Sequence, residues 1–135
     1  MKKRNQDIKF IKAALIIGFL LFLWRLINSI INSIINSNLD MSFLTFAIPL
    51  IIWGFSPYIL LYLLRNIFMK NKLSLILSLI ALIGMDLIIH AEVFLWPSSS
   101  TSALIFLVSP IYLVIAMLIG KFTGDLISWI IKKSK

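Results

Sequence analysis

An apolar stretch that contains two carboxylates and the only histidine of the chain decides the fold. It reads Gly84-Met85-Asp86-Leu87-Ile88-Ile89-His90-Ala91-Glu92-Val93-Phe94-Leu95-Trp96-Pro97. The stretch ends an apolar run that begins near Leu73 and is long enough to cross a membrane as a helix. An ionisable side chain at that depth is costly unless a partner neutralises it. We therefore expect another part of the chain to supply a partner for Asp86.

The composition predicts an all-α membrane protein. Hydrophobic residues make up 61% of the 135 residues, and the mean hydropathy is +1.04. A globule of this size cannot hide so much apolar surface from water, so we expect a single membrane domain over residues 1–135. The chain has no cysteine, which excludes disulfides, thiolate catalysis and cysteine-based metal sites.

The apolar runs predict an up-and-down bundle of four transmembrane helices, at about 8–35, 43–64, 73–95 and 103–120. An amphipathic tail at 121–135 follows, and we expect it to lie on the cytoplasmic membrane surface, with an extension of the fourth span as the alternative. Pro49, Pro57 and Pro110 fall inside spans and predict kinks, with a hinge or a broken-helix binding site in the second span as the alternative. The basic N-terminus resembles a secretory signal, but its apolar run is too long, so we expect a retained first span.

The basic residues predict the orientation. The net charge is +8, and twelve of the thirteen Lys and Arg residues lie in the N-terminus, the loop at 65–72 or the tail. The two opposite turns, 38–42 and 98–102, hold none. By the positive-inside rule, both termini are cytoplasmic in a bacterial cytoplasmic membrane, with anionic lipid headgroups as partners. The basic residues form no stripe interleaved with aromatics, so we expect no nucleic-acid partner.

Arg25 is the basic residue that the orientation does not explain. It lies thirteen residues after Lys12, and Asp86 lies fourteen after Lys72, which places both about 20 Å from the cytoplasmic ends of their helices. Since both helices leave the same face, the sequence predicts an ion pair between the first and third spans.

Further polar residues lie close to this pair in sequence. His90 follows Asp86 by one helical turn, and Asn28 and Asn32 follow Arg25. Period-four Asn and Ser residues predict a helix-packing seam, with a wall of a hydrated vestibule or a low-complexity accident as alternatives. Glu92 faces away from His90, near the headgroups. Three interpretations stay open: a structural pair, a site for an ion, proton or small solute, and a recognition surface.

The sequence predicts no enzyme. It has no phosphate-binding glycine loop and no metalloprotease helix motif. Ser98 to Ser100 with His90 do not make a catalytic triad, because capping explains the serines. Asp86 and His90 alone are too few ligands for a metal, and we expect no metal and no cofactor.

The outer turn carries a resemblance. Val93, Phe94 and Pro97 precede a run of Ser and Thr, and an Ala-Leu run from Ala103 ends at Pro110. This pattern resembles one in small four-span bacterial membrane proteins. The resemblance implies a short outer hairpin between the third and fourth spans, and it transfers no catalytic residue.

We therefore expect a small inner-membrane protein with a binding or accessory role, immunity-like in kind. Its candidate site is the polar cluster of the outer leaflet, and its partner is another membrane protein or a second copy. The alternative is a small oligomeric transporter or channel for an ion, a proton or a small polar solute.

Overall fold

The computed structural model describes residues 2–35, 41–94 and 102–134, and every regular element within these ranges is an α-helix. Long apolar runs favour helices because a helix satisfies its own backbone hydrogen bonds without water. The elements, in chain order, are α1 (Lys2–Ile35), α2 (Met41–Leu63), α3 (Arg65–Phe68), α4 (Lys72–Phe94) and α5 (Ser102–Lys133). The all-α class expected from the composition is confirmed.

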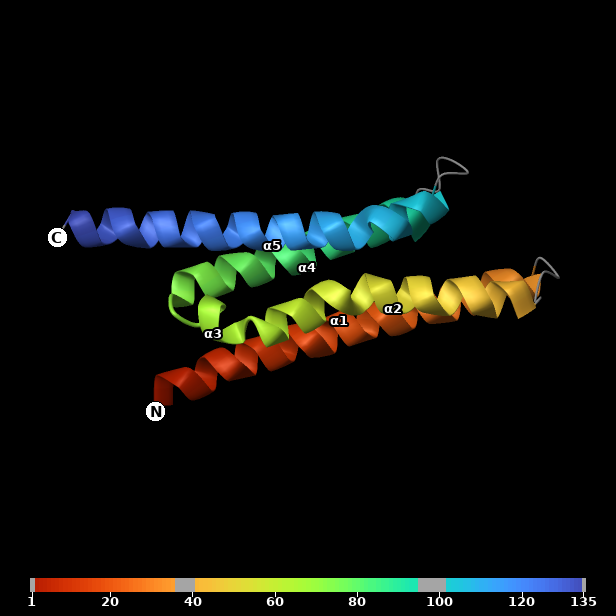
Figure 1. Cartoon of the computed structure of the whole chain (residues 1–135), viewed down its shortest axis with the longest axis horizontal. Coiled ribbons are helices and arrows are strands. Elements are labelled where there is room, and N and C mark those ends of the chain that lie inside the picture. The colour runs from red at the N-terminus through yellow and green to blue at the C-terminus, as the bar shows by residue number, and fades with distance from the viewer. Residues whose placement is uncertain (1, 36–40, 95–101, 135) are drawn as a thin grey trace.

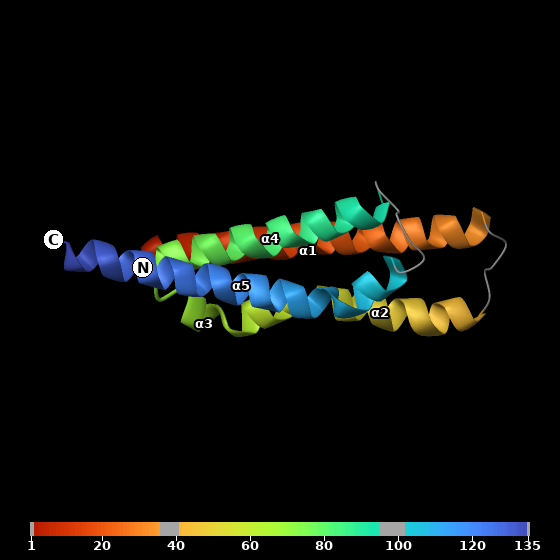
Figure 2. The same cartoon turned by 90° about the horizontal axis from the view of Figure 1, so that it is seen from above.

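The four long helices pack as two pairs. In Figure 1, α1 and α2 lie along one side, and α4 and α5 lie along the other. Figure 2, turned by 90°, shows α4 beside α1 and α5 beside α2. Each long helix therefore has two neighbours, and the N- and C-termini lie toward the same end of the molecule. We call α1 with α2 the first helix pair, and α4 with α5 the second helix pair.

Three of these helices contain a segment that is long and apolar enough to cross a membrane: Asp7–Asn28, Lys72–Ala91 and Leu107–Lys133. The apolar segment found in α2, Ile52–Leu63, is shorter. Large hydrophobic side chains are exposed on α1, α2, α4 and α5. Such a surface suits a lipid environment, where an outward apolar face carries no penalty.

The second helix pair is packed closely because two glycines of α5 face the backbone of α4. A Cβ atom on Gly120 would lie 2.5 Å from the carbonyl oxygen of Leu77 and 2.8 Å from Cα of Ser78. One turn later, a Cβ atom on Gly124 would lie 2.6 Å from the backbone nitrogen of Ser74. Small residues four positions apart let two helix backbones approach each other. This seam sets the distance between α4 and α5.

Polar contacts at the basic end of the seam fix the register of the second pair. Asp125 accepts hydrogen bonds from Lys121 Nζ at 2.6 Å and from Asn71 Nδ2 at 3.1 Å. Ser74 Oγ donates to the carbonyl oxygen of Lys121 at 3.0 Å. Asn71 also caps α4, because its Oδ1 accepts the backbone N–H of Leu73 at 3.1 Å. A one-turn slip of α5 along α4 would break the contacts of Asn71 with Asp125 and of Ser74 with Lys121.

A tryptophan joins the two pairs beside a proline. Pro110 lies inside α5 and has no N–H, so the helix hydrogen bond to the carbonyl group four residues earlier, in the preceding turn, is missing. Trp53 Nε1 of α2 donates to the carbonyl oxygen of Leu107 in that turn, at 3.0 Å. The indole thus connects α2 to α5 beside the proline.

The helix bounds can be compared with the predicted spans. The second and third spans begin and end within two residues of α2 and α4, whereas α1 begins at Lys2, earlier than expected. The structure also differs after residue 120, where α5 continues as one helix to Lys133. The physical reason is the seam, since Gly120 and Gly124 hold both sides of the expected break against α4. The predicted turns around 38–40 and 98–101 lie outside the described residues.

Candidate functional site

A buried cluster of polar side chains lies where α1, α2 and α4 meet. We call it the central polar cluster, and its members are Arg25, Tyr58, Asp86 and His90. Their relative exposures are 5%, 1%, 1% and 6%, in the same order. Polar groups buried this deeply are tolerated only when they are hydrogen-bonded, and charges only when they are paired.

An ion pair between α1 and α4 forms the middle of the cluster. Arg25 Nη2 donates to Asp86 Oδ1, and both side chains are almost fully buried. This is the contact expected from the matching depths of the two residues. The pair neutralises two charges that would each be costly alone in an apolar bundle.

His90 extends the cluster by one helical turn. Arg25 Nε donates to His90 Nε2 at 2.8 Å. Since Nε2 accepts this hydrogen bond, the ring proton lies on Nδ1, which is 2.7 Å from the backbone carbonyl oxygen of Asp86. Nδ1 also lies 3.3 Å from Asp86 Oδ1. The hydrogen bond from Arg25 therefore favours the tautomer that carries its proton on Nδ1.

Tyr58 brings α2 into the cluster. Its hydroxyl group donates to Asp86 Oδ2 at 2.7 Å, so both oxygens of the carboxylate have a partner. The phenol ring packs flat against Gly18 of α1, where a Cβ atom would lie 2.6 Å from a ring carbon. The ring also stacks on Phe55, with the two ring centroids 5.6 Å apart. Tyr58 thus connects three of the long helices.

Gly54 makes room for the guanidinium group. A Cβ atom at this position of α2 would collide with Arg25 Nη1. Because α2 has a glycine here, the arginine can reach across the bundle from α1 to α4. The glycine has a packing role that is independent of any turn.

The cluster can neutralise charge and rearrange protons, but it offers no preformed metal centre. Within the described ranges, no group of three or more His, Cys, Asp or Glu residues could hold a metal ion. The Asp86 carboxylate accepts a hydrogen bond from Tyr58 and lies 3.3 Å from His90 Nδ1, and neighbouring groups of these types can exchange protons when their contacts change.

The structure brings together only part of the set predicted from the sequence. Arg25, Asp86 and His90 meet in the cluster. Asn28 donates a hydrogen bond at 2.9 Å to the carbonyl oxygen of Trp24, in its own helix. Asn32 lies in α1 and Glu92 in α4, but their side chains lie outside the described part of the structure.

The sequence reasoning missed Tyr58 and Gly54. A phenol in an apolar span usually finds a hydrogen-bond partner, and this was the available signal for Tyr58. Tyr58 lies only seven residues before Arg65, however, so counting from the basic loop would place it nearer the cytoplasm than Asp86. Arg65 is the first residue of the short helix α3 and Lys72 is the first residue of α4, so the two basic residues are not a common depth marker.

Replacing Tyr58 by phenylalanine is expected to lower the free energy of unfolding by about 1–3 kcal/mol, because a buried carboxylate oxygen loses its donor. Thermal unfolding in detergent measures the loss. Tyr112→Phe is the matched control, since that residue is 52% exposed. Equal stability of the two variants would show that the hydroxyl group of Tyr58 does not support the ion pair.

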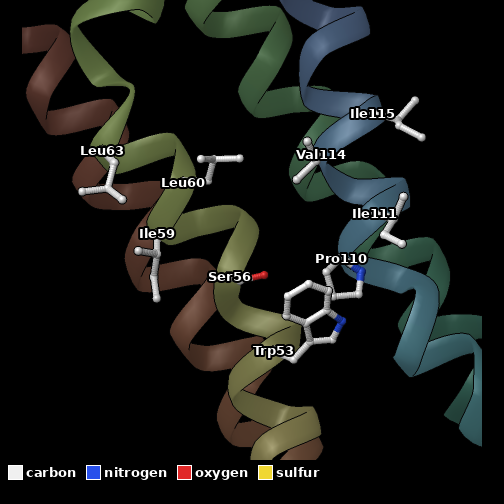
Figure 3. A pocket seen from close by; sticks show the side chains of 9 residues that line it. All are labelled: Trp53, Ser56, Ile59, Leu60, Leu63, Pro110, Ile111, Val114 and Ile115. Atoms are coloured by element: carbon white, nitrogen blue, oxygen red, sulfur yellow. The ribbon is translucent and has the colours of Figure 1, made fainter.

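Two apolar grooves flank the cluster, one on each side where the helix pairs meet. The first groove, about 460 Å³, lies between α2 and α5 (Figure 3). Its lining residues are Trp53, Ser56, Ile59, Leu60, Leu63, Pro110, Ile111, Val114 and Ile115. The second groove, about 490 Å³, lies between α1 and α4 and includes Gly84. The helix pairs are therefore incompletely packed against each other outside the cluster.

Comparison with known proteins assigns the chain to no family. No protein-family model, no curated protein and no solved structure matches the chain. The arrangement of the central polar cluster and the two grooves is therefore the basis on which a function is inferred.

Proposed function

We propose that this protein is a small four-span protein of the bacterial cytoplasmic membrane that binds another membrane protein or a second copy of itself. It is not an enzyme, and its role is accessory, as in an immunity-like protein. The observation that carries the proposal is the contrast between a closed polar centre and an apolar, grooved exterior.

The membrane topology rests on charge and on the fold. Both termini lie toward the same end of the bundle, and the basic loop between α2 and α4 lies at that end too (Figure 1). Twelve basic residues gather in these three segments. The positive-inside rule then puts the termini in the cytoplasm, beside anionic headgroups, and requires α2 to cross the bilayer with the other three helices.

The binding role is supported by an apolar groove that no other part of the bundle fills. Both carboxylate oxygens of Asp86 have hydrogen-bond partners inside the bundle. The carboxylate therefore serves to hold the helices together and not to bind a solute. The first groove, in contrast, is lined almost entirely by apolar side chains and is open on one side. A transmembrane helix of a partner can pack there through van der Waals contact, which is the main force between helices in lipid.

Transport of a proton or another small ion is the second candidate, and one observation favours it. In the interior of an apolar bundle, the Asp86 carboxylate accepts from Tyr58 and lies 3.3 Å from His90 Nδ1. Proton pathways in membranes use residues of these types. An oligomer would then enclose the path, because four helices alone surround little space.

A flux measurement separates the two candidates. The protein is reconstituted into liposomes of phosphatidylethanolamine and phosphatidylglycerol that contain a pH-sensitive dye, and a pH gradient is imposed. The binding role predicts that the gradient decays no faster than in protein-free liposomes. A faster decay that Asp86→Asn abolishes would contradict the binding role and support proton transport.

Photocrosslinking in the native membrane tests the binding role directly. A benzoylphenylalanine at Ile111, which lines the first groove and is 55% exposed, should form a discrete adduct with a membrane protein or a second copy. Phe19 of α1 is the control, because it is 50% exposed and lies outside both grooves. Adducts that are equal at the two positions would show that the groove is not the contact surface.

A further inference from the structure

Besides the hydrogen bond from Trp53 to Leu107, the two helix pairs are joined by side-chain hydrogen bonds that meet at one turn of α4. Arg25 and Tyr58 come from the first pair, and both donate to the carboxylate of Asp86 in the second pair. Arg25 donates in addition to His90. On either side of these contacts lie the two grooves, where the pairs are not tightly packed. The association of the pairs therefore depends on this turn together with the buried apolar core and the hydrogen bond from Trp53 to Leu107.

We infer that His90 makes this association sensitive to acid: protonation of its Nε2 atom releases the first helix pair from the second. This inference goes beyond the proposed function, since it does not depend on which partner or solute the protein serves.

The reason is the direction of one hydrogen bond. Arg25 Nε carries a proton and donates it toward His90 Nε2 across 2.8 Å. A proton added to Nε2 removes the acceptor lone pair and places two N–H groups face to face, on two cations. The contact changes from attractive to repulsive, in a site where burial weakens the screening of charges by water.

The protonated ring also competes for the carboxylate. His90 Nδ1 already lies 3.3 Å from Asp86 Oδ1, the oxygen that receives Arg25 Nη2. An imidazolium can move toward this oxygen within its own helix, so Asp86 is neutralised inside α4. The guanidinium group of Arg25 then no longer has an anionic partner that holds it between α2 and α4.

The charged and titratable groups around His90 come from the elements packed against it. Arg25 faces it from α1, Asp86 from one turn earlier in α4, and Tyr58 of α2 is linked to it through Asp86. Among the described side chains of α5, Ser109 is polar and buried, and Tyr112 is 52% exposed. Of these groups, histidine is the type that ordinarily titrates between pH 5 and 8. In the proposed topology, His90 lies about 6 Å nearer the outer face than Asp86, so external acid reaches it first.

Spin labels on the two pairs provide the test. The chain has no cysteine, so Ile59→Cys on α2 and Ile115→Cys on α5 would be the only labelled positions. Both residues line the first groove and are 44% and 48% exposed. On acidification from pH 8 to pH 5, the electron–electron distance in full-length protein in lipid nanodiscs should increase by about 2–5 Å and broaden.

The same labels on His90→Gln provide the control. The amide oxygen of glutamine can take the place of Nε2 and accept from Arg25 at every pH, so the distance should stay at its pH 8 value. A wild-type distance that does not change with pH would overturn the inference. An equal change in the His90→Gln variant would overturn it too.

A measurement on unlabelled wild-type protein covers the case in which the variant fails to fold. Because the chain has a single histidine, ¹⁵N-histidine labelling yields one pair of imidazole nitrogen signals. At pH 8 these should report a neutral ring with its proton on Nδ1, and at pH 5 an imidazolium. A ring that is already charged at pH 8, that carries its proton on Nε2, or that stays neutral at pH 5 would refute the inference.

Discussion

Replacing Asp86 by leucine is expected to lower the free energy of unfolding by about 3–5 kcal/mol, the usual effect of removing one partner from a buried ion pair. The substitution leaves the guanidinium group of Arg25 in an apolar bundle without its carboxylate. It also removes the acceptor of the Tyr58 hydroxyl group. Thermal or denaturant unfolding of the purified protein in detergent measures the loss.

The double variant Arg25→Leu with Asp86→Leu decides what the pair does. Removal of both charges leaves no buried charge uncompensated, and such replacements are often neutral or stabilising. We expect the double variant to recover most of the stability that either single variant loses. If Asp86→Leu alone leaves the protein as stable as the wild type, the ion pair does not hold the bundle. Asp86 would then become the first candidate for a transport site.

Replacing Gly120 by leucine is expected to lower the free energy of unfolding by about 3 kcal/mol, the upper end of the range for overpacked contacts. Even the first carbon of the new side chain would lie 2.5 Å from the carbonyl oxygen of Leu77. Side chains can change rotamer, but this obstacle is backbone. The second helix pair must therefore separate, and the hydrogen bond from Ser74 to Lys121 lengthens or breaks.

Gly84→Leu is the matched control for this substitution. Nothing lies within 4 Å of a Cβ atom on Gly84, which faces the second groove. Leucine is also the better helix former by about 0.8–1 kcal/mol. We expect this variant to be as stable as the wild type or more stable. If both glycine variants lose the same stability in thermal unfolding, the seam between α4 and α5 does not explain the effect at Gly120.

The fold could be predicted from the sequence where one rule was decisive. The runs that became α2 and α4 are bounded by polar or basic residues, and their ends were predicted within two residues. The sequence left the continuation of α5 past Gly120 open, because the length of the run favoured a tail on the membrane surface. The expected break came from counting the residues needed to cross a membrane, whereas the helix is continued by glycine packing on Ser74 and Leu77. Such packing depends on a neighbouring helix that the local sequence does not reveal.

Only the part of the central polar cluster that follows from counting residues along the helices could be predicted. Arg25 and Asp86 were paired by counting residues along two helices that start from the same face, and their contact is present. To place Tyr58 at the same depth, residues would have to be counted along α2 from Arg65. The short helix α3 begins at Arg65, so this residue does not mark the same depth in the membrane as Lys72. The role of Gly54 could not be predicted, because it depends on the guanidinium group of Arg25 passing α2, and this contact exists only in the assembled bundle.

The separation of Arg25 and Asp86 along the chain has a consequence for synthesis. The two residues are 61 positions apart, and the ribosome adds about 5–20 residues per second, so about 3–12 s pass between them. In the proposed topology, α1 enters the translocon during this interval with an arginine that lacks its carboxylate. Central arginine costs about 2.5–3.5 kcal/mol on insertion scales, and the apolar residues from Ala13 to Trp24 must offset it. The first helix thus reaches its final environment only when α4 emerges.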